Sequence, residues 1–213
     1  MIAQAAGGDA EQAAQRKDEL RREIQARRAG RAHSAADDAR TARLLAFLDA
    51  AGLAAPGSVV ASYGSMPGEP DTWAVIDELR ARGVRVLLPV LRRQPAWAWY
   101  AGREQLTPSW HDIPEPTTPR LAAESLWLAQ AIVVSGLAGA PSGARVGTGG
   151  GWYDRALTHA ATSARTIVLL NDDEVLPEVP RAPWDRLVDV IVTPVRSIVT
   201  EWGAGRGAVI AAE

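Results

Sequence analysis

Hydrophobic and polar residues alternate along the chain in blocks that predict strands and helices in turn. Residues 58–64 (SVVASYG) and 84–90 (VRVLLPV) are short apolar runs, and a helix is predicted between them at 71–82, ending before Gly83. A strand, a helix and a second strand in this order predict a β-α-β unit, in which the helix crosses over between two parallel strands.

The same rhythm returns in the second half of the chain. Apolar runs at 131–137, 165–172 and 187–194 predict further strands, the last of them being the final strand, and residues 152–164 predict a helix. The segments between the predicted strands and helices have other patterns. Small and aromatic residues alternate at 96–102, which predicts an edge strand, and the Pro-rich segments 109–119 and 177–183 predict loops.

Two helices are predicted before the first strand. Residues 10–29 are rich in Ala, Glu, Gln and Arg and contain no Gly or Pro, and apolar positions recur through 34–51. The expected fold is α/β: a three-layer sandwich with a mostly parallel sheet flanked by helices and an N-terminal helical pair. We expect residues 1–10 to be a disordered leader, 11–200 a single domain and 201–213 a loose tail.

Composition narrows the possible functions. The 213 residues include 23 Lys and Arg against 25 Asp and Glu, so no basic field favours nucleic-acid binding. The absence of Cys excludes disulfides, thiolate metal sites and cysteine nucleophiles. Without an apolar run of about 20 residues or a secretory signal, the sequence predicts a soluble, cytoplasmic protein without a membrane partner. The sequence contains no long apolar heptad pattern of the kind that forms a coiled-coil dimer, so a monomer is expected.

The most informative stretch is the loop from Gly143 to Arg155, between a predicted strand and a predicted helix. Its glycines allow backbone N–H groups to approach an anion, and its arginines suit phosphate oxygens, although a loop that merely needs positive φ angles would have the same composition. It matches neither the Walker loop nor the dinucleotide fingerprint. Asp154 could compensate a helix dipole or hold Mg²⁺ beside bound phosphates.

Residues 145–155, R-V-G-T-G-G-G-W-Y-D-R, resemble the R-L-G-x-G-G-G-x-Y-D-R signature of the 5-formyltetrahydrofolate cyclo-ligase family. Further blocks are similar to that family in the same order. They are Lys17-x-x-x-Arg21, S-Y-G-S-M-P-G-E-P-D-T at 62–72, L-L-P-V at 87–90, D-I-P-E-P at 112–116 and P-W-D-R-L-V-D-V-I-V-T-P at 183–194.

This resemblance implies an enzyme that uses ATP as co-substrate and Mg²⁺ as cofactor. It would convert 5-formyltetrahydrofolate, with or without a polyglutamate tail, to 5,10-methenyltetrahydrofolate, releasing ADP and phosphate. The formyl oxygen would take the γ-phosphoryl group, and N10 would then close the ring. Such chemistry needs positioning and charge neutralisation rather than a covalent protein nucleophile.

The resemblance also implies roles for individual residues. ATP would be bound by Lys17, Arg21, Arg145, Gly147, Thr148, Gly149, Gly150, Gly151, Trp152, Tyr153 and Asp154. The folate would be bound by Tyr63, Met66, Glu69, Trp110 and Tyr153. The metal ligands would be Asp154 and Asp185. Taken alone, each position has a structural alternative: a solvated helix face for Lys17 and Arg21, a loop carboxylate for Glu69, an aromatic shield for Trp110 and a turn for Asp185.

The segment before the glycine loop departs from the family pattern. Ser135, Gly139 and Ala140 stand where the family has a proline, an apolar residue and an aspartate. An alternative function is therefore a catalytically impaired folate- or nucleotide-binding regulator of the same fold. A relative of sugar-phosphate isomerases or acyl-CoA transferases is a third possibility, because an α/β architecture does not specify chemistry.

Overall fold

The computed structural model describes residues 2–31, 34–109 and 112–208, with side chains from residue 11 onward. Its centre is a seven-stranded sheet in the order β11-β10-β9-β6-β1-β2-β3, whose five inner strands are parallel and whose two edge strands are antiparallel. The strands are β1 (Val59–Ala61), β2 (Arg85–Val90), β3 (Ala96–Trp99), β6 (Ala131–Val134), β9 (Arg165–Leu169), β10 (Val190–Val192) and β11 (Ser197–Val199).

The remaining elements surround this sheet. The α-helices are α1 (Ile2–Arg28), α2 (Ala35–Ala50), α3 (Trp73–Ala81), α4 (Trp152–Ala156) and α5 (Glu201–Gly205). The 3₁₀ turns are η1 (Arg103–Gln105), η3 (Ala123–Leu128), η4 (Leu157–His159) and η5 (Asp172–Glu174). Two small hairpins pair β4 (Leu106–Pro108) with β5 (Pro114–Pro116), and β7 (Ala138–Gly139) with β8 (Arg145–Val146).

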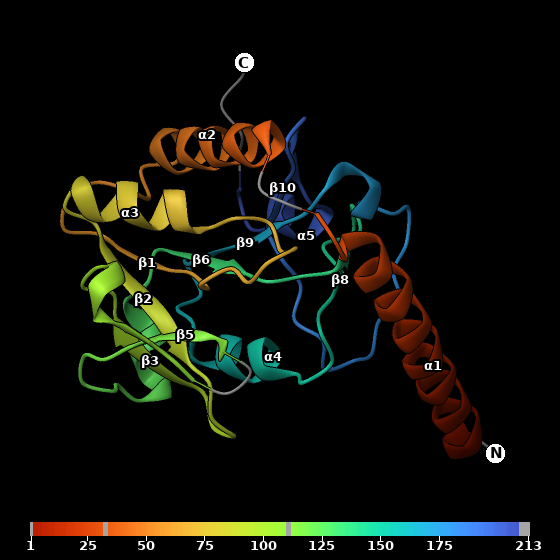
Figure 1. Ribbon diagram of the computed structural model, residues 1–213. Helices are drawn as coiled ribbons and strands as arrows, with labels where there is room; N and C mark the ends of the chain where they lie inside the picture. Colours follow the sequence, from red (N-terminus) through yellow and green to blue (C-terminus); the bar gives the residue numbers. More distant parts are fainter. Residues whose placement is uncertain (1, 32–33, 110–111, 209–213) are drawn as a thin grey trace.

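Helices cover both faces of the large sheet, as Figure 1 shows. Successive strand residues point to opposite faces, so Val60 packs with α2 and α3 while Ala61 packs with α4 and η3. A strand that is buried on both faces has a continuous run of apolar residues, and for this reason the inner strands could be predicted from the sequence. The expected three-layer α/β class is confirmed.

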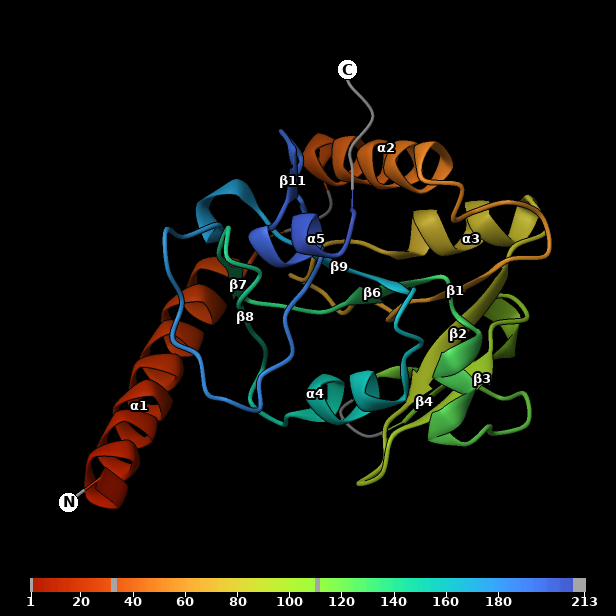
Figure 2. The ribbon, with the colours of Figure 1, turned by 180° about the vertical axis from the view of Figure 1, so that it is seen from behind.

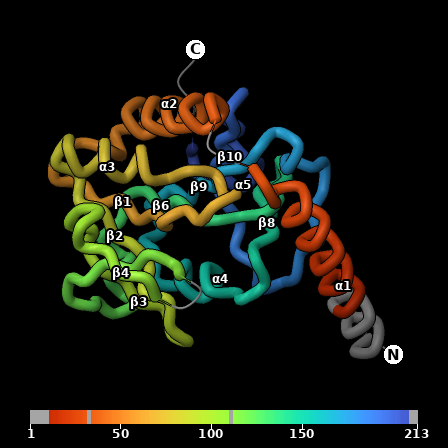
Figure 3. Tube along the Cα trace, viewed as in Figure 1, coloured from red at the N-terminus to blue at the C-terminus, as the bar shows by residue number. Residues whose placement is uncertain are grey.

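The two N-terminal helices pack against different parts of the domain. Helix α2 lies on the sheet, whereas α1 runs along one side of the molecule and projects beyond it (Figures 2 and 3). Ile24 of α1 is fully buried against Leu137 and Val146 of the β7–β8 region. The helix that carries Lys17 and Arg21 is therefore held by the hairpin that leads into the glycine loop.

Three local expectations are corrected. The helix expected at 152–164 ends at Ala156, because Thr158 Oγ1 donates to the Arg155 carbonyl oxygen at 2.6 Å and the chain tightens into η4. The Pro-rich segment 109–119 contains β5, whose prolines suit a two-stranded edge ribbon. The strand predicted last is followed by β11, which returns antiparallel after the turn at Pro194.

The expected division into leader, domain and tail stays a prediction. In the structure, residues 2–10 belong to α1, and residues 201–205 form α5. Among the described residues, no helix has both the length and the apolar character needed to cross a membrane.

Candidate active site

A cavity of about 1280 Å³ opens at the carboxyl edge of the parallel strands. From β1 the chain moves to β2 on one side, whereas β6, β9 and β10 extend the sheet on the other. Tyr63 follows β1, Ser135 follows β6, and both line the cavity. The point where strand order reverses is where open α/β sheets bind ligands, because the two connecting loops part there.

The glycine loop forms one wall of this cavity. Gly149 and Gly151 have φ angles of 111° and 59°, which side-chain-bearing residues rarely adopt. A Cβ on Gly147 would come within 2.8 Å of Arg145 Nη1. The loop thus requires glycine at 149 and 151 for its backbone conformation, while a side chain at 147 would displace the end of Arg145.

Arg145 and Asp154 connect the two ends of the loop. The guanidinium Nη2 donates to Asp154 Oδ1 at 3.2 Å, and Nη1 donates to the Ser135 carbonyl oxygen at 3.1 Å. The same Asp154 oxygen accepts the backbone N–H of Arg186 at 3.0 Å. Asp154 therefore joins the start of α4 to the 181–187 loop, which brings Asp185 to the same side of the cavity.

Helix α1 supplies cations to this wall. Lys17 forms a shielded ion pair with Asp185, which also accepts the Ala182 N–H at 2.7 Å. Arg21 Nε donates to the Gly147 carbonyl oxygen at 2.9 Å. Two residues one helical turn apart thus reach the metal-ligand candidate and the glycine loop, so the solvated-face alternative for Lys17 and Arg21 does not hold.

The opposite wall contains the residues expected to bind the folate. Glu69 Oε2 accepts the Met66 N–H at 2.9 Å, which closes a tight turn beside Tyr63. Burial raises the pKa of Glu69, while the hydrogen bond from Met66 and the charge of Arg28 lower it in part. A carboxylate with one backbone partner in a shielded wall remains able to accept further hydrogen bonds from a ligand.

Tyr153 lies at the junction of the two walls. Its ring packs edge-on against Trp152 at a centroid distance of 5.0 Å, and Arg145 lies 5.9 Å from its ring centroid. Burial, with the nearby charge of Glu69, raises the pKa of the Tyr153 hydroxyl. That hydroxyl is buried and has no hydrogen-bond partner among the described residues. Buried polar groups without partners are rare in native proteins, so a ligand atom is the natural partner here.

The residues expected in the site are brought together, with one exception that lies outside the described residues. All the expected ATP, folate and metal residues apart from Trp110 line the same cavity. Further lining residues went unpredicted, among them Arg92, Arg93, Arg181 and Arg186. Paired arginines after a strand and around the W-D motif were the available signal, but a charge run ordinarily indicates a solvated face.

The carboxylates fit a magnesium ion that arrives with phosphate. Mg²⁺ takes oxygen ligands and is commonly held by one or two carboxylates together with substrate phosphates. Asp154 and Asp185 provide two carboxylates near the glycine loop. The described residues contain no group of three acidic or His side chains that could hold a metal ion.

The departures before the glycine loop do not remove a group from the cavity. Gly139 and Ala140 lie in the β7–β8 hairpin and, in the described part of the chain, do not line the cavity. A Cβ on Gly139 would lie 3.0 Å from Leu170 Cδ1. At Ser135 the contact with Arg145 is made by the backbone carbonyl, which any residue supplies.

The fold and cavity define a parallel α/β domain with a cationic, glycine-lined ligand site at its switch point. The sequence model of the 5-formyltetrahydrofolate cyclo-ligase family matches residues 13–194, and the chain belongs to this family of enzymes. It is 40% identical over 155 residues to 5-formyltetrahydrofolate cyclo-ligase of Mycolicibacterium smegmatis, covering 70% of this chain and 79% of that protein.

Other relatives are more distant. The 5-formyltetrahydrofolate cyclo-ligase of Escherichia coli K12 is 30% identical over 148 residues, covering 67% of this chain and 80% of that protein. The NMR structure of Aquifex aeolicus 5,10-methenyltetrahydrofolate synthetase superimposes with a TM-score of 0.72 at 23% identity, covering 87% of this chain and 93% of that one. This structural likeness supports the fold assignment.

Proposed function

We propose that the protein converts 5-formyltetrahydrofolate to 5,10-methenyltetrahydrofolate with cleavage of ATP to ADP and phosphate. The observation that carries the proposal is the convergence of Lys17, Arg21, Arg145, Asp154 and Glu69 on one cavity. These residues come from three separate parts of the chain. Cations and glycines form one wall and a shielded carboxylate the other, which suits a phosphate donor beside a neutral heterocycle.

In this mechanism the formyl oxygen of the folate attacks the γ-phosphorus, forming an O–P bond as the bond to ADP breaks. N10 then attacks the activated carbon, and phosphate leaves with the former formyl oxygen and, in the overall balance, with the proton that N10 loses. Lys17, Arg21 and Arg145 neutralise the charge that develops on the phosphoryl oxygens. Bound Mg²⁺, held by Asp154 and Asp185, would neutralise the phosphates further.

The folate is held by the other wall. Glu69 accepts hydrogen bonds from the pterin, and Tyr63 and Met66 cover its apolar surface. The Tyr153 hydroxyl lies between the two ligands and donates to a substrate oxygen or nitrogen. Trp110 belongs to the same proposal through the family motif.

The direct test mixes the purified protein with (6S)-5-formyltetrahydrofolate, ATP and Mg²⁺ and follows the near-ultraviolet absorbance of the methenyl product. The band is expected to grow only when ATP and Mg²⁺ are both present. Arg145→Ala removes a charged phosphate contact and should raise the KM for ATP about 10- to 100-fold. Asp154→Asn should raise the Mg²⁺ concentration needed for half-maximal rate, and an unchanged requirement contradicts its ligand role.

The alternative, a binding protein without turnover, rests on Ser135 and Ala140. It predicts that 5-formyltetrahydrofolate quenches the tryptophan fluorescence while no methenyl band develops. The same two measurements therefore separate the two functions. We place the protein in the cytoplasm and expect it to act as a monomer.

A further inference from the structure

Helix α5 lies against the β7–β8 hairpin that leads into the glycine loop. The family model ends at residue 194, so β11 and α5 lie outside the matched part of the chain. The backbone N–H of Glu201, the first residue of α5, donates to the Pro141 carbonyl oxygen at the tip of the hairpin, at 2.9 Å. The hairpin is therefore held from two sides, by α1 and by α5, as Figure 2 shows.

The tip of the hairpin, residues 140–143, is a tight turn that packs closely on its neighbours. The Gly143 N–H donates to the Ala140 carbonyl oxygen at 2.8 Å, and Ala140 has no polar side chain that could stabilise the turn. Gly143 has a φ of 93°, and a Cβ there would lie 2.8 Å from the Val188 carbonyl oxygen and 3.2 Å from Thr200 Oγ1. The tip thus contacts both the chain before β10 and the start of α5.

One set of hydrogen bonds, the Gly143–Val188 joint, connects the hairpin, the 181–187 loop and α5. The Val188 N–H donates to the Gly143 carbonyl oxygen at 2.9 Å, and the Thr200 hydroxyl donates to the Val188 carbonyl oxygen at 2.7 Å. The same hydroxyl accepts the Gly203 N–H at 3.0 Å and so caps α5. Thr200 and Val188 are fully buried, so the loss of one bond would leave a buried polar group unpaired.

The joint lies close along the chain to two groups of the site. Arg145 follows Gly143 by two residues on the hairpin, and Asp185 precedes Val188 by three residues. Both line the cavity, on segments that meet at the joint. A displacement of the joint therefore changes the separation between the guanidinium and the carboxylate.

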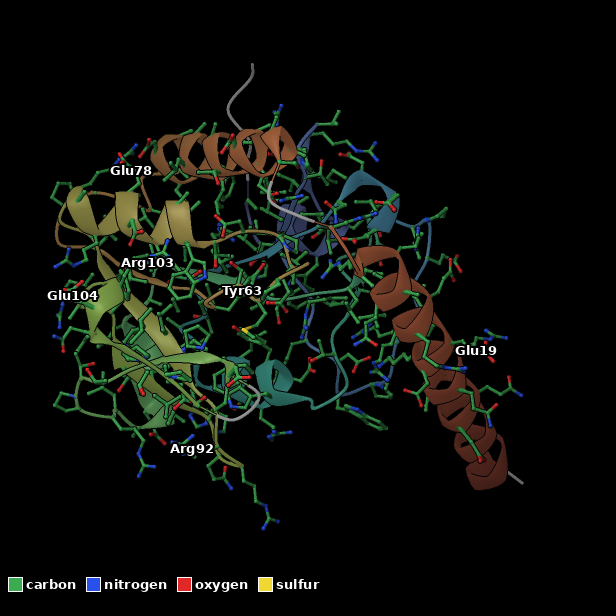
Figure 4. The ribbon with its side chains drawn as sticks, viewed as in Figure 1. Glu19, Tyr63, Glu78, Arg92, Arg103 and Glu104 are labelled. Carbon is green, nitrogen blue, oxygen red and sulfur yellow. The ribbon has the colours of Figure 1, made fainter. Side chains whose placement is uncertain are left out.

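These two groups belong to the end of the cavity that α1 forms. The cavity extends from Tyr63, near the middle of the molecule, to α1, on which Glu19 is labelled at one side of Figure 4. The proposed function places the phosphates at the α1 end and the folate at the wall that contains Glu69. A brace at the α1 end should therefore affect the binding of ATP and leave the binding of the folate unchanged.

Resting on the proposed function, we infer that α5 is a brace of the ATP site. Through the Glu201–Pro141 bond and the Thr200 hydroxyl, it holds Arg145 and Asp185 at the separation that ATP binding requires. In the described part of the chain, neither Glu201 nor Thr200 lines the cavity, so Thr200 is a positioning residue. A misplacement of about 1 Å can cost a catalytic site about 100-fold in rate, so a small movement of the tip suffices.

The test removes the Glu201 N–H and retains the helix. Glu201→Pro puts a ring carbon in the place of the hydrogen, so the Pro141 carbonyl oxygen must move away from α5. Proline is favoured at the first position of a helix, and Thr200, with φ −74° and ψ 163°, already has the extended conformation that suits the residue before a proline. Glu201→Ala removes the same exposed side chain and keeps the N–H, so it is the matched control.

Both variants are examined by steady-state turnover and by calorimetric binding. Glu201→Pro should raise the KM for ATP, and the Kd for a non-hydrolysable ATP analogue with Mg²⁺, about tenfold. The Kd for 5-formyltetrahydrofolate without nucleotide should stay at the wild-type value, and Glu201→Ala should leave all three constants unchanged. Wild-type nucleotide constants in Glu201→Pro would overturn the inference, as would equal losses for nucleotide and folate, which a general loosening of the fold would cause.

Thr200 supplies a second pair of variants, which decides the inference if Glu201→Pro does not fold. Thr200→Val removes the hydroxyl and keeps the shape of the side chain, and it should show the same selective loss of nucleotide binding. Thr200→Ser keeps the hydroxyl and should restore the Kd for the analogue to within about threefold of wild type.

Thr193→Val controls for destabilisation. Thr193 is as buried as Thr200, its hydroxyl lies 2.9 Å from Asp172 Oδ1, and in the described part of the chain it does not line the cavity. Thr193→Val should leave the Kd for the analogue unchanged. If it weakened nucleotide binding as much as Thr200→Val, the effect would be one of stability and the inference would be wrong.

The two proposals can fail separately. If wild-type protein shows no turnover, the proposed reaction is wrong, while the calorimetric comparison of analogue and folate still decides the role of α5. If Glu201→Pro and Thr200→Val bind the analogue as wild type does, α5 is not a brace and the reaction stands. Absence of analogue binding to the wild-type protein contradicts both.

Discussion

Arg28 of α1 and Glu174 of η5 form a two-pronged ion pair that is buried on both sides. Arg28 Nε and Nη2 lie 2.7 and 2.6 Å from the two carboxylate oxygens, and Nη2 also donates to the Gly136 carbonyl oxygen at 2.9 Å. The pair joins the end of α1 to the chain after β9 and after β6. Because Lys17 and Arg21 lie about three and two turns earlier on α1, it positions both cations over the cavity.

Removing one partner of this pair should destabilise the fold and weaken nucleotide binding together. Glu174→Ala leaves Arg28 buried and unpaired, so the free energy of unfolding should fall by about 3–5 kcal/mol in urea titrations. The double variant Arg28→Met/Glu174→Leu should recover much of that stability but not the KM for ATP, since α1 loses its directional anchor. A double variant with a wild-type KM would show that the pair does not position α1.

The same pair predicts a dependence of stability on pH. Despite the opposing effect of burial, the hydrogen bond and charge of Arg28 lower the pKa of Glu174 below its usual 4.5. A carboxylate with a lowered folded-state pKa stabilises the protein above its unfolded-state pKa, and this stabilisation is lost as the pH falls through the folded-state value. The stability difference between wild type and Glu174→Gln should therefore shrink below about pH 4.5. A constant difference from pH 7 to pH 3 would contradict this assignment.

Substitutions at two adjacent glycines, Gly150 and Gly151, distinguish the effect of backbone strain from the effect of blocking the ligand. A Cβ at Gly151 would sit on a residue with a φ of 59°, whereas Gly150 does not have a positive φ and a Cβ there meets no atom within 4 Å. Gly151→Ala should lower the free energy of unfolding by about 1 kcal/mol, and Gly150→Ala should leave it unchanged.

If phosphate contacts the loop backbone, Gly150→Ala should still raise the KM for ATP, because its methyl group occupies the path of the ligand. A Gly150→Ala protein with wild-type stability and wild-type KM would remove this part of the loop from the site. Thermal unfolding without ligand and steady-state kinetics are the two measurements.

Sequence patterns predicted the inner sheet and singled out the glycine loop, because both depend on local signals. Continuous apolar runs mark strands buried on both faces, and the loop from Gly147 to Gly151 adjoins the strand and helix that define it. Spacing also suggested that Lys17 and Arg21 share a helix face. Their contacts with Asp185 and Gly147 depend on tertiary packing, and only the family resemblance anticipated a shared site.

The features that were missed have non-local causes. The β4–β5 pairing joins two Pro-containing segments across a loop, and β11 is a three-residue edge strand that its partner β10 orders. Arg28 and Glu174 are 146 residues apart and become a pair only when α1 packs against the β7–β8 hairpin. Hydrophobic periodicity contains no information on either kind of contact.

Glu69 is expected to lower the stability of the folded protein and to strengthen the binding of the substrate. Its pKa is raised by burial, so the charged form is disfavoured in the folded state, and its contribution to stability decreases as the pH rises through its titration. Glu69→Gln removes this penalty. The variant should be at least as stable as wild type at pH 7, with a KM for 5-formyltetrahydrofolate raised about tenfold or more by the loss of a charged acceptor. Lower stability with an unchanged KM would indicate a purely structural role.

The hydroxyl groups of Tyr153 and Tyr63 give opposite predictions for the same chemical change. The Tyr153 hydroxyl is buried without a partner among the described residues, whereas the Tyr63 hydroxyl donates to the Pro70 carbonyl oxygen at 3.0 Å. Tyr153→Phe should therefore maintain or raise the free energy of unfolding, while Tyr63→Phe should lower it by about 1 kcal/mol.

In turnover assays, Tyr153→Phe rather than Tyr63→Phe should be the more impaired variant. Tyr153→Phe loses the donor proposed to face the substrate and should raise the KM for 5-formyltetrahydrofolate about tenfold. Tyr63→Phe retains the ring that lines the cavity and should change that KM less than about threefold, because its hydroxyl is occupied by Pro70. Urea titrations and steady-state kinetics on the two variants complete the comparison. If Tyr153→Phe were destabilised with a wild-type KM, its hydroxyl would have a protein partner rather than a substrate one.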